Sequence, residues 1–269
     1  MYQGLPTARG PIGDALLQTG LLLDFAVRTA AAGFRAVCRA RFGWSEFLQQ
    51  ASFLAAVTTL PALLVTIPLG VVVALNVGSL AGQLGAQGYG GAVVAFVIVG
   101  QAAPLICALM ISGVGGSAMC SDLGARKIRD EIDALEVMGL PVVERLVVPR
   151  VVAAAVVNTL LACIVLLVGI ATTFLFQMWV LGDAPGAFLR TLTQFSRVPD
   201  FVVALLKAAV FAVITAVVSC FKGLTAKGGP GGVATAVNEA VVISFVLVFV
   251  ANTVMTELYP VLVPAKGEY

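Results

Sequence analysis

The chain contains no histidine, and only 11% of its 269 residues are charged. The absence of histidine excludes imidazole metal sites, a histidine-ligated haem and any catalytic pair of a nucleophile with histidine. Ordinary soluble domains are about 25% charged, so too few charged side chains are present to cover a water-soluble globule. The net charge of +2 provides no field that would attract nucleic acid.

Two further kinds of motif are missing. No Gly-x-x-x-x-Gly-Lys-Ser/Thr motif occurs, and the sequence has no Gly-Lys pair, which excludes a phosphate-binding loop for ATP. The five cysteines show no Cys-x-x-Cys spacing and lie mostly in or beside apolar runs, which is typical of small buried hydrophobic residues. They are Cys38, Cys107, Cys120, Cys163 and Cys220. We expect no disulfide framework, no metal site and no cofactor.

What the sequence does have is apolar length, since 60% of its residues are hydrophobic and its mean hydropathy is +1.04. Five apolar runs each exceed the ~20 helical residues that cross a hydrocarbon core of ~30 Å. A helix satisfies its backbone polar groups within one segment, so the sequence predicts an all-α integral membrane protein. Pro61, Pro68 and Pro104 should kink or break these helices. The five runs are about 53–77, 92–118, 151–180, 201–221 and 240–260.

Lysine and arginine are distributed asymmetrically around these spans. Residues 1–52 and the loops 119–150 and 222–239 together carry twelve, whereas the segments on the other side carry three. The positive-inside rule therefore places the N-terminus in the cytoplasm and the C-terminus outside. We expect a multi-pass protein of the inner (plasma) membrane.

An amphipathic stretch at about 30–50 precedes the first span. Its apolar residues Phe34, Val37, Cys38 and Phe42 recur at helical spacing, and arginines cluster away from them. This pattern predicts a helix in the membrane interface. An ordinary juxtamembrane anchor with no part in transport is an equally open interpretation.

The segment 119–150 holds eleven of the thirty charged residues and must therefore face water. Ile128, Ile132 and Leu135 recur there at helical spacing, and Gly139 followed by Pro141 predicts that the helix ends near Met138. Opposite charges four residues apart predict ion pairs along this helix. The predicted pairs are Arg126–Asp130, Lys127–Glu131 and Arg129–Asp133.

Two interpretations of this helix stay open. A solvated loop folded back on the membrane surface is one, because charge runs are usually solvated faces. A docking element is the other, since a short helix with an apolar stripe and mixed charge suits a groove on a soluble partner. Such a partner could supply energy to a chain that has no nucleotide site of its own.

Three stretches in this segment belong together. They are Asp122 to Arg126 (Asp-Leu-Gly-Ala-Arg), Glu131 to Gly139 (Glu-Ile-Asp-Ala-Leu-Glu-Val-Met-Gly) and Leu146 to Arg150 (Leu-Val-Val-Pro-Arg). Together they resemble the signature of the MlaE/YrbE permeases, membrane subunits of ABC transporters that work with MCE-domain lipid-binding proteins. The layout of spans is also similar, so we interpret 1–269 as one domain of this type. The form from Cys120 to Arg126 resembles the second, B-type permease of actinobacterial Mce systems.

The resemblance implies a permease dimer, here with a paralogue, and a separate ABC ATPase that receives a coupling segment at about 122–141. Glu131, Asp133 and Glu136 would be its polar contacts, Leu135 and Met138 its apolar anchors, and Gly139 its sharp turn. MCE-domain proteins would be further partners, with no nucleic acid. The substrates would be lipids: fatty acids, mycolic acids, sterols or phospholipids. The chain itself would be a transport subunit and not an enzyme.

Fixed charges in or at the edges of the spans are few, namely Lys207, Glu239 and Glu257. This scarcity agrees with lipid cargo, because an unpaired buried ion costs several kcal/mol. Near the outer end of the fourth span, Lys207 is expected to snorkel to the interface, with a lipid head-group contact as the alternative. Two other functions stay open, an ATP-independent lipid carrier and a membrane-embedded enzyme. The second would need convergent titratable groups, and the sequence offers no convincing set.

Overall fold

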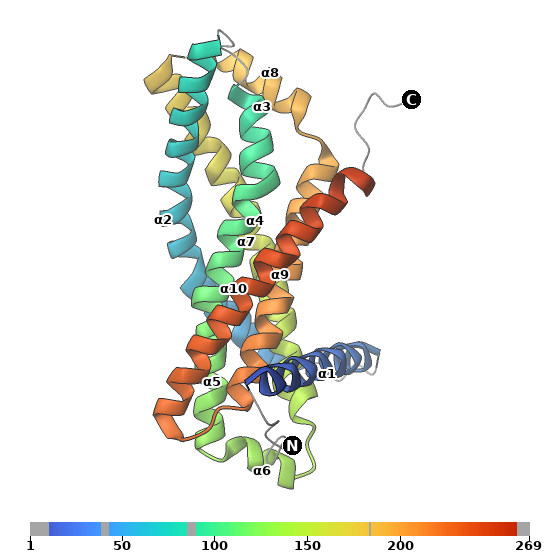
Figure 1. Ribbon diagram of the computed structural model, residues 1–269. Helices are drawn as coiled ribbons and strands as arrows, with labels where there is room; N and C mark the ends of the chain where they lie inside the picture. Colours follow the sequence, from blue (N-terminus) through green and yellow to red (C-terminus); the bar gives the residue numbers. More distant parts are fainter. Residues whose placement is uncertain (1–10, 39–42, 85–89, 183, 263–269) are drawn as a thin grey trace.

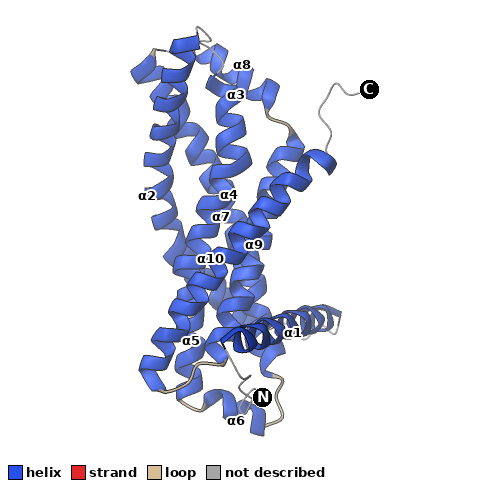
Figure 2. Ribbon diagram, in the orientation of Figure 1, coloured by secondary structure: helices blue, strands red, loops and turns tan. Residues whose placement is uncertain are grey.

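The computed structural model describes residues 11–38, 43–84, 90–182 and 184–262, which form helices and short connections without any strand (Figure 1, Figure 2). The all-α prediction is confirmed. In chain order the helices are α1 (Pro11–Cys38), α2 (Trp44–Leu84), α3 (Gly90–Val94), η1 (Ala95–Ala102), α4 (Ala103–Met110), η2 (Ile111–Gly115), α5 (Gly116–Ile128), α6 (Glu131–Val137), η3 (Val143–Val147), α7 (Val148–Phe176), η4 (Gln177–Leu181), α8 (Pro185–Phe195), α9 (Val198–Leu224) and α10 (Gly229–Leu262).

Five helical rods are long and apolar enough to cross a membrane, which confirms the predicted number of spans. Each of the five apolar runs read from the sequence lies inside one rod. The shortest rod has 27 residues and is therefore about 40 Å long, more than the ~30 Å of a hydrocarbon core. The rods are Trp44–Ser79, Gly90–Ile128, Val143–Val180, Val198–Leu224 and Gly229–Val261.

The prolines inside the spans act differently from one another. Helix α2 continues through both Pro61 and Pro68 without a break. At Pro104 the geometry changes, because the π-helical segment η1 ends just before it and α4 begins. Proline has no N–H to bond the carbonyl four residues earlier, which here is the carbonyl of Gly100. The second rod thus carries the irregularity that the sequence predicted at Pro104.

Helices α7 and α9 lie inside the bundle and pack against each other and against α4, while α7 also packs against α2 and α9 against α5 and α10. In the middle of this core Asn158 of α7 donates a hydrogen bond of 2.8 Å to the carbonyl of Ala208 in α9, which pairs a polar group that would be costly in hydrocarbon. Helices α2 and α10 instead leave large apolar side chains exposed, such as Leu64 and Val250. The core side chains are those of Ala62, Val99, Ala103, Ile106, Cys107, Leu161, Ala162, Val165, Leu166, Ala204 and Ala208.

The helix before the first span differs from the predicted one at about 30–50. It is α1, it ends at Cys38, and Trp44 already begins α2. The side chains of Phe34, Val37, Cys38 and Phe42, which motivated that prediction, lie outside the part of the chain described. The buried face of α1 is formed by Phe25, Thr29 and Ala32, which come before the four residues of that prediction. The centroid of the Phe25 ring lies 5.6 Å from that of Phe221. Packing on the chain itself therefore sets where α1 lies, across the bundle (Figure 1).

The bundle has two distinct ends. Helix α6 lies at the end near α1, and α3 and α8 lie at the opposite end (Figure 1). Lys207 of α9 lies between these ends and is only 3% exposed. The expectation that it snorkels to the interface is therefore wrong. Its ammonium group turns inward to the carbonyl of Gly100 and the hydroxyl of Thr256.

Close packing of α3 on α8 generates the first prediction. A Cβ atom on Gly91 would lie 2.2 Å from the carbonyl oxygen of Phe188, so Gly91→Ala should force the two helices apart and destabilise the protein by about 1–3 kcal/mol. Thermal unfolding of the detergent-solubilised chain measures this. Gly186→Ala in α8 is the control, because a Cβ there meets no atom within 4 Å. Equal unfolding temperatures for the two variants would contradict the packing argument.

Candidate functional site

The short helix α6 is defined by a break on each side. After α5 ends at Ile128 the chain turns, and Asp130 adopts a left-handed backbone with φ of 56°. At the other end Gly139 has φ of 72°, and the N–H groups of Gly139 and Leu140 bond the carbonyls of Glu136 and Leu135 at 3.0 Å. This is the Schellman arrangement that glycine favours. The predicted helix end near Met138 is confirmed.

The turn at Asp130 makes the three predicted ion pairs wrong. Residues on either side of it belong to different helices, so a spacing of four no longer brings them to one face. The observed pairs join Lys127 to Asp133 and Arg129 to Glu131, the latter at 2.7 Å. The hydrogen bond and the negative charge of Glu131 raise the pKa of the Arg129 guanidinium above its ordinary value.

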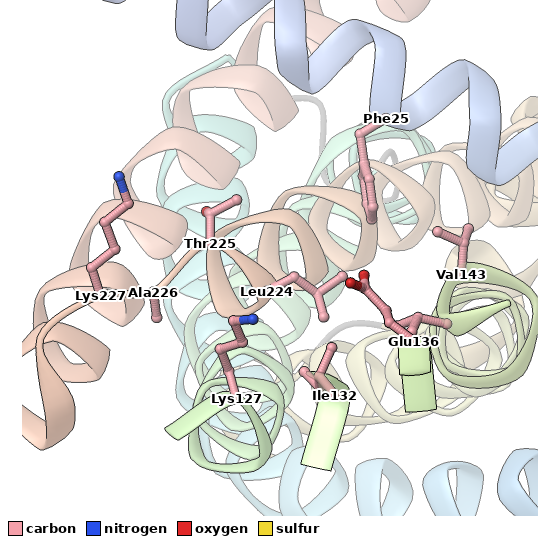
Figure 3. Close-up of a pocket in the computed structure, with 10 residues that line it drawn as sticks. Phe25, Lys127, Ile132, Glu136, Val143, Leu224, Thr225, Ala226 and Lys227 are labelled. Carbon is pink, nitrogen blue, oxygen red and sulfur yellow. The ribbon is translucent and has the colours of Figure 1, made fainter. Parts of the chain in front are cut away.

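The inner face of α6 is seated on the chain itself. Ile132 is 3% exposed, and Leu135 packs against a cluster that includes Phe25 of α1 and Phe221 of α9. Figure 3 shows Phe25 and Leu224 approaching Ile132 around a small cavity of about 100 Å³. Helix α6 therefore packs against α1 and the end of α9.

The outer face of α6 carries two apolar side chains without cover. Val137 is 88% exposed and Met138 is 63% exposed. Of the six residues predicted for coupling, Glu131, Glu136, Met138 and Gly139 are exposed, Asp133 is half-buried beside Lys127, and Leu135 turns inward. Val137 is not among the six residues predicted from the sequence. Its position five residues after Ile132 was the available signal, because that spacing puts the two on opposite helix faces.

A buried charge network that was not predicted from the sequence connects the two ends of the segment that carries α6. The side chain of Arg150, at the start of α7, is 0% exposed and reaches Asp122 of α5 at 2.6 Å and Glu46 of α2 at 3.0 Å. Its guanidinium also donates to the carbonyl of Leu146 at 3.1 Å. Arg126 pairs with both carboxylates from the outside, at 3.4 Å and 3.9 Å. Three helices are thereby tied at one point.

Among the described residues, no three cysteine, aspartate or glutamate side chains gather closely enough to hold a metal ion. The described cysteines Cys107, Cys120, Cys163 and Cys220 are free thiols, three of them buried.

Removal of the Arg150 charge should destabilise the chain. Arg150→Met leaves Asp122 and Glu46 without their main partner, and we expect a loss of about 2–3 kcal/mol, below the roughly 3–5 kcal/mol of fully buried pairs because both carboxylates stay partly solvated. Denaturant unfolding in detergent measures it. Arg145→Met is the control in the same segment, since Arg145 is exposed and should change stability by about 0.5 kcal/mol or less. Equal losses in the two variants would contradict this role.

The chain is similar in sequence to several known proteins. A probable ABC transporter permease protein of Synechocystis is 32% identical over 162 residues, which are 60% of this chain and 62% of that protein. The chloroplastic protein TRIGALACTOSYLDIACYLGLYCEROL 1 of Arabidopsis thaliana is 31% identical over 63% of this chain and 48% of its own length. A probable ABC transporter permease protein of Rickettsia bellii is 28% identical over 62% of this chain and 64% of its own length.

The matched region thus spans less than two thirds of each of these relatives. A family-wide match reaches further along this chain. The family described as Permease MlaE matches residues 47–258, from the start of α2 almost to the end of α10. Since that match covers more than half of the chain, with α6 and all or nearly all of each apolar rod, the chain belongs to the MlaE permease family.

Proposed function

We propose that the chain is the permease subunit of an MCE-associated ABC transporter that moves lipids across or out of the inner membrane. A separate ATPase subunit powers it, because the chain has no phosphate-binding loop. Family membership supports the proposal, as do relatives named as ABC transporter permeases. Lipid cargo is further supported by the Arabidopsis relative, which is named for trigalactosyldiacylglycerol.

The observation that carries this proposal is the two-sided character of α6. Its outer face presents Val137 and Met138, while its inner face is fixed by Ile132. A short helix with exposed apolar anchors and flanking acids suits a groove on a soluble protein. Glu131, Asp133, Glu136 and Gly139 complete the coupling surface. Leu135 supports this surface indirectly, because its side chain packs on the inner face of α6 against the rest of the chain.

The distribution of charge supports an orientation. The end that carries α6 also carries the Arg126 and Arg150 network and the paired charges Asp24 and Arg28 of α1. We place this end in the cytoplasm and the C-terminus on the outer side. Leu23 and Val27 on the outward side of α1 are more than 60% exposed, which suits a helix in the membrane interface.

Further partners complete the assembly. This chain resembles a B-type permease, and a second permease that is its paralogue would pair with it in the membrane. MCE-domain proteins would receive or deliver lipid on the outer side. Because α2 and α10 expose apolar side chains along the bundle, both offer surface to lipid or to a second subunit.

Copurification of the ATPase tests the coupling surface. Val137→Asp combined with Met138→Asp should reduce ATPase recovery at least about tenfold, since charged groups would replace two apolar anchors of the kind that dominate interfaces. Glu131→Lys should weaken it less. Glu144→Lys is the control for charge reversal in the same loop but outside α6. Full ATPase recovery with the double variant would refute the docking assignment, and lipid transport in liposomes at full rate without ATPase would identify a carrier instead.

Cysteine labelling tests the orientation in intact cells. In a background with the native cysteines replaced by alanine, Met138→Cys should react with a membrane-impermeant maleimide only after permeabilisation, whereas Arg190→Cys on exposed α8 should react before it. Both positions are exposed, so accessibility within the chain is matched. The reverse pattern would overturn the proposed orientation.

A further inference from the structure

A cavity lies at the end of the bundle that is away from α6. It is partly open, has a volume of about 550 Å³ and is lined by η1, the beginning of α9 and the last turns of α10. This volume is within the range of ordinary small-ligand sites, about 300–1,000 Å³. Its apolar lining is formed by Ala92, Ala95, Phe96, Val203, Ala204 and Pro260.

One charge lies deep within this apolar wall. Lys207 is the tenth residue of α9 and therefore lies roughly 14 Å along the helix from its start. Its Nζ donates to the carbonyl of Gly100 at 3.3 Å and to the hydroxyl of Thr256 at 2.9 Å. Within the described residues no carboxylate comes within 4.0 Å of this ammonium group. An ammonium has three donors, so these two bonds leave one donor of Lys207 available at a residue that lines the cavity.

The other charged residues that line the cavity are Arg197, Asp200 and Glu257, and neither carboxylate forms an ion pair with Lys207. The carboxylate of Asp200 is already engaged by the hydroxyl of Tyr259 and by the backbone N–H of Arg197 at 2.7 Å. Glu257 lines the same cavity but is exposed, and the guanidinium of Arg197 adds a second positive charge. A cation without a counter-ion is costly in a membrane-spanning segment, and an anion from outside the chain would offset that cost.

We propose that this cavity binds the anionic head group of an amphipathic lipid, whose carboxylate or phosphate accepts a hydrogen bond from Lys207. The alkyl chain lies along the apolar lining beside Phe96, which is 76% exposed and so reaches the hydrocarbon. Gln101 donates to the same Thr256 hydroxyl at 3.5 Å and helps to fix the polar end. This inference rests on the proposed lipid function and names the chemical class of its substrate.

Photocrosslinking on the purified full-length chain in detergent tests the site. The probe is a fatty acid with a diazirine near its carboxyl group, and the competitors are oleate, dioleoylphosphatidate and the neutral oleyl alcohol. We expect at least one anionic competitor to displace the probe at least about tenfold better than oleyl alcohol, because a charge-assisted hydrogen bond is lost with the alcohol. Crosslinked peptides should contain Gln101 or Thr256. Stronger competition by oleate would identify a carboxylate head group, and stronger competition by dioleoylphosphatidate would identify a phosphate.

Three variants complete the test. Lys207→Met should abolish the preference for anions while leaving oleyl alcohol binding unchanged, and Lys207→Arg should keep most of the preference. Arg190→Met, which removes the same charge from exposed α8 outside the cavity, should behave as the wild type. Crosslinks outside the cavity, or a wild-type chain that does not distinguish oleate from oleyl alcohol, would overturn the inference even if Lys207→Met failed to fold. Full ATPase recovery with Val137→Asp combined with Met138→Asp, together with an unchanged anion preference of the wild-type chain, would count against the coupling proposal alone.

Discussion

Three helices meet at the guanidinium group of Arg150, and the position of α6 depends on that junction. A fully buried guanidinium is tolerated only where carboxylates and carbonyls pair with it or accept its hydrogen bonds. Here Asp122, Glu46 and the Leu146 carbonyl do so. Because Asp122 precedes α6 and Arg150 follows it, their ion pair closes the loop that carries α6. The loop is held at its base by charge and at its middle by Ile132.

Helix α9 joins the two ends of the molecule. Phe221 and Leu224 support α6 at one end of this helix, and Asp200 and Lys207 line the cavity toward the other. A helix of 27 residues is about 40 Å long, so α9 forms a continuous path between α6 and the cavity. The π-helical segments η1 and η2 in the neighbouring rod supply less regular backbone beside that path.

Periodicity and composition predicted the spans but not the contacts of the polar groups. The end of α6 could be predicted because Gly139 and Pro141 act locally through backbone geometry. The pairing of Arg126, Lys127 and Arg129 could not, since a left-handed backbone at the single residue Asp130 changed which side chains face each other. Arg150 was visible in the sequence, but its partners lie on helices far along the chain.

The sequence by itself determined that this is an all-α membrane protein with five spans and a charged segment between the second and third, because apolar length and hydrogen-bond satisfaction in lipid leave no other solution. The inward turn of Leu135 and the burial of Lys207 were decided only by the tertiary structure. Each depends on which helices pack side by side, and helix packing brings together residues whose separation along the chain carries no periodic signal.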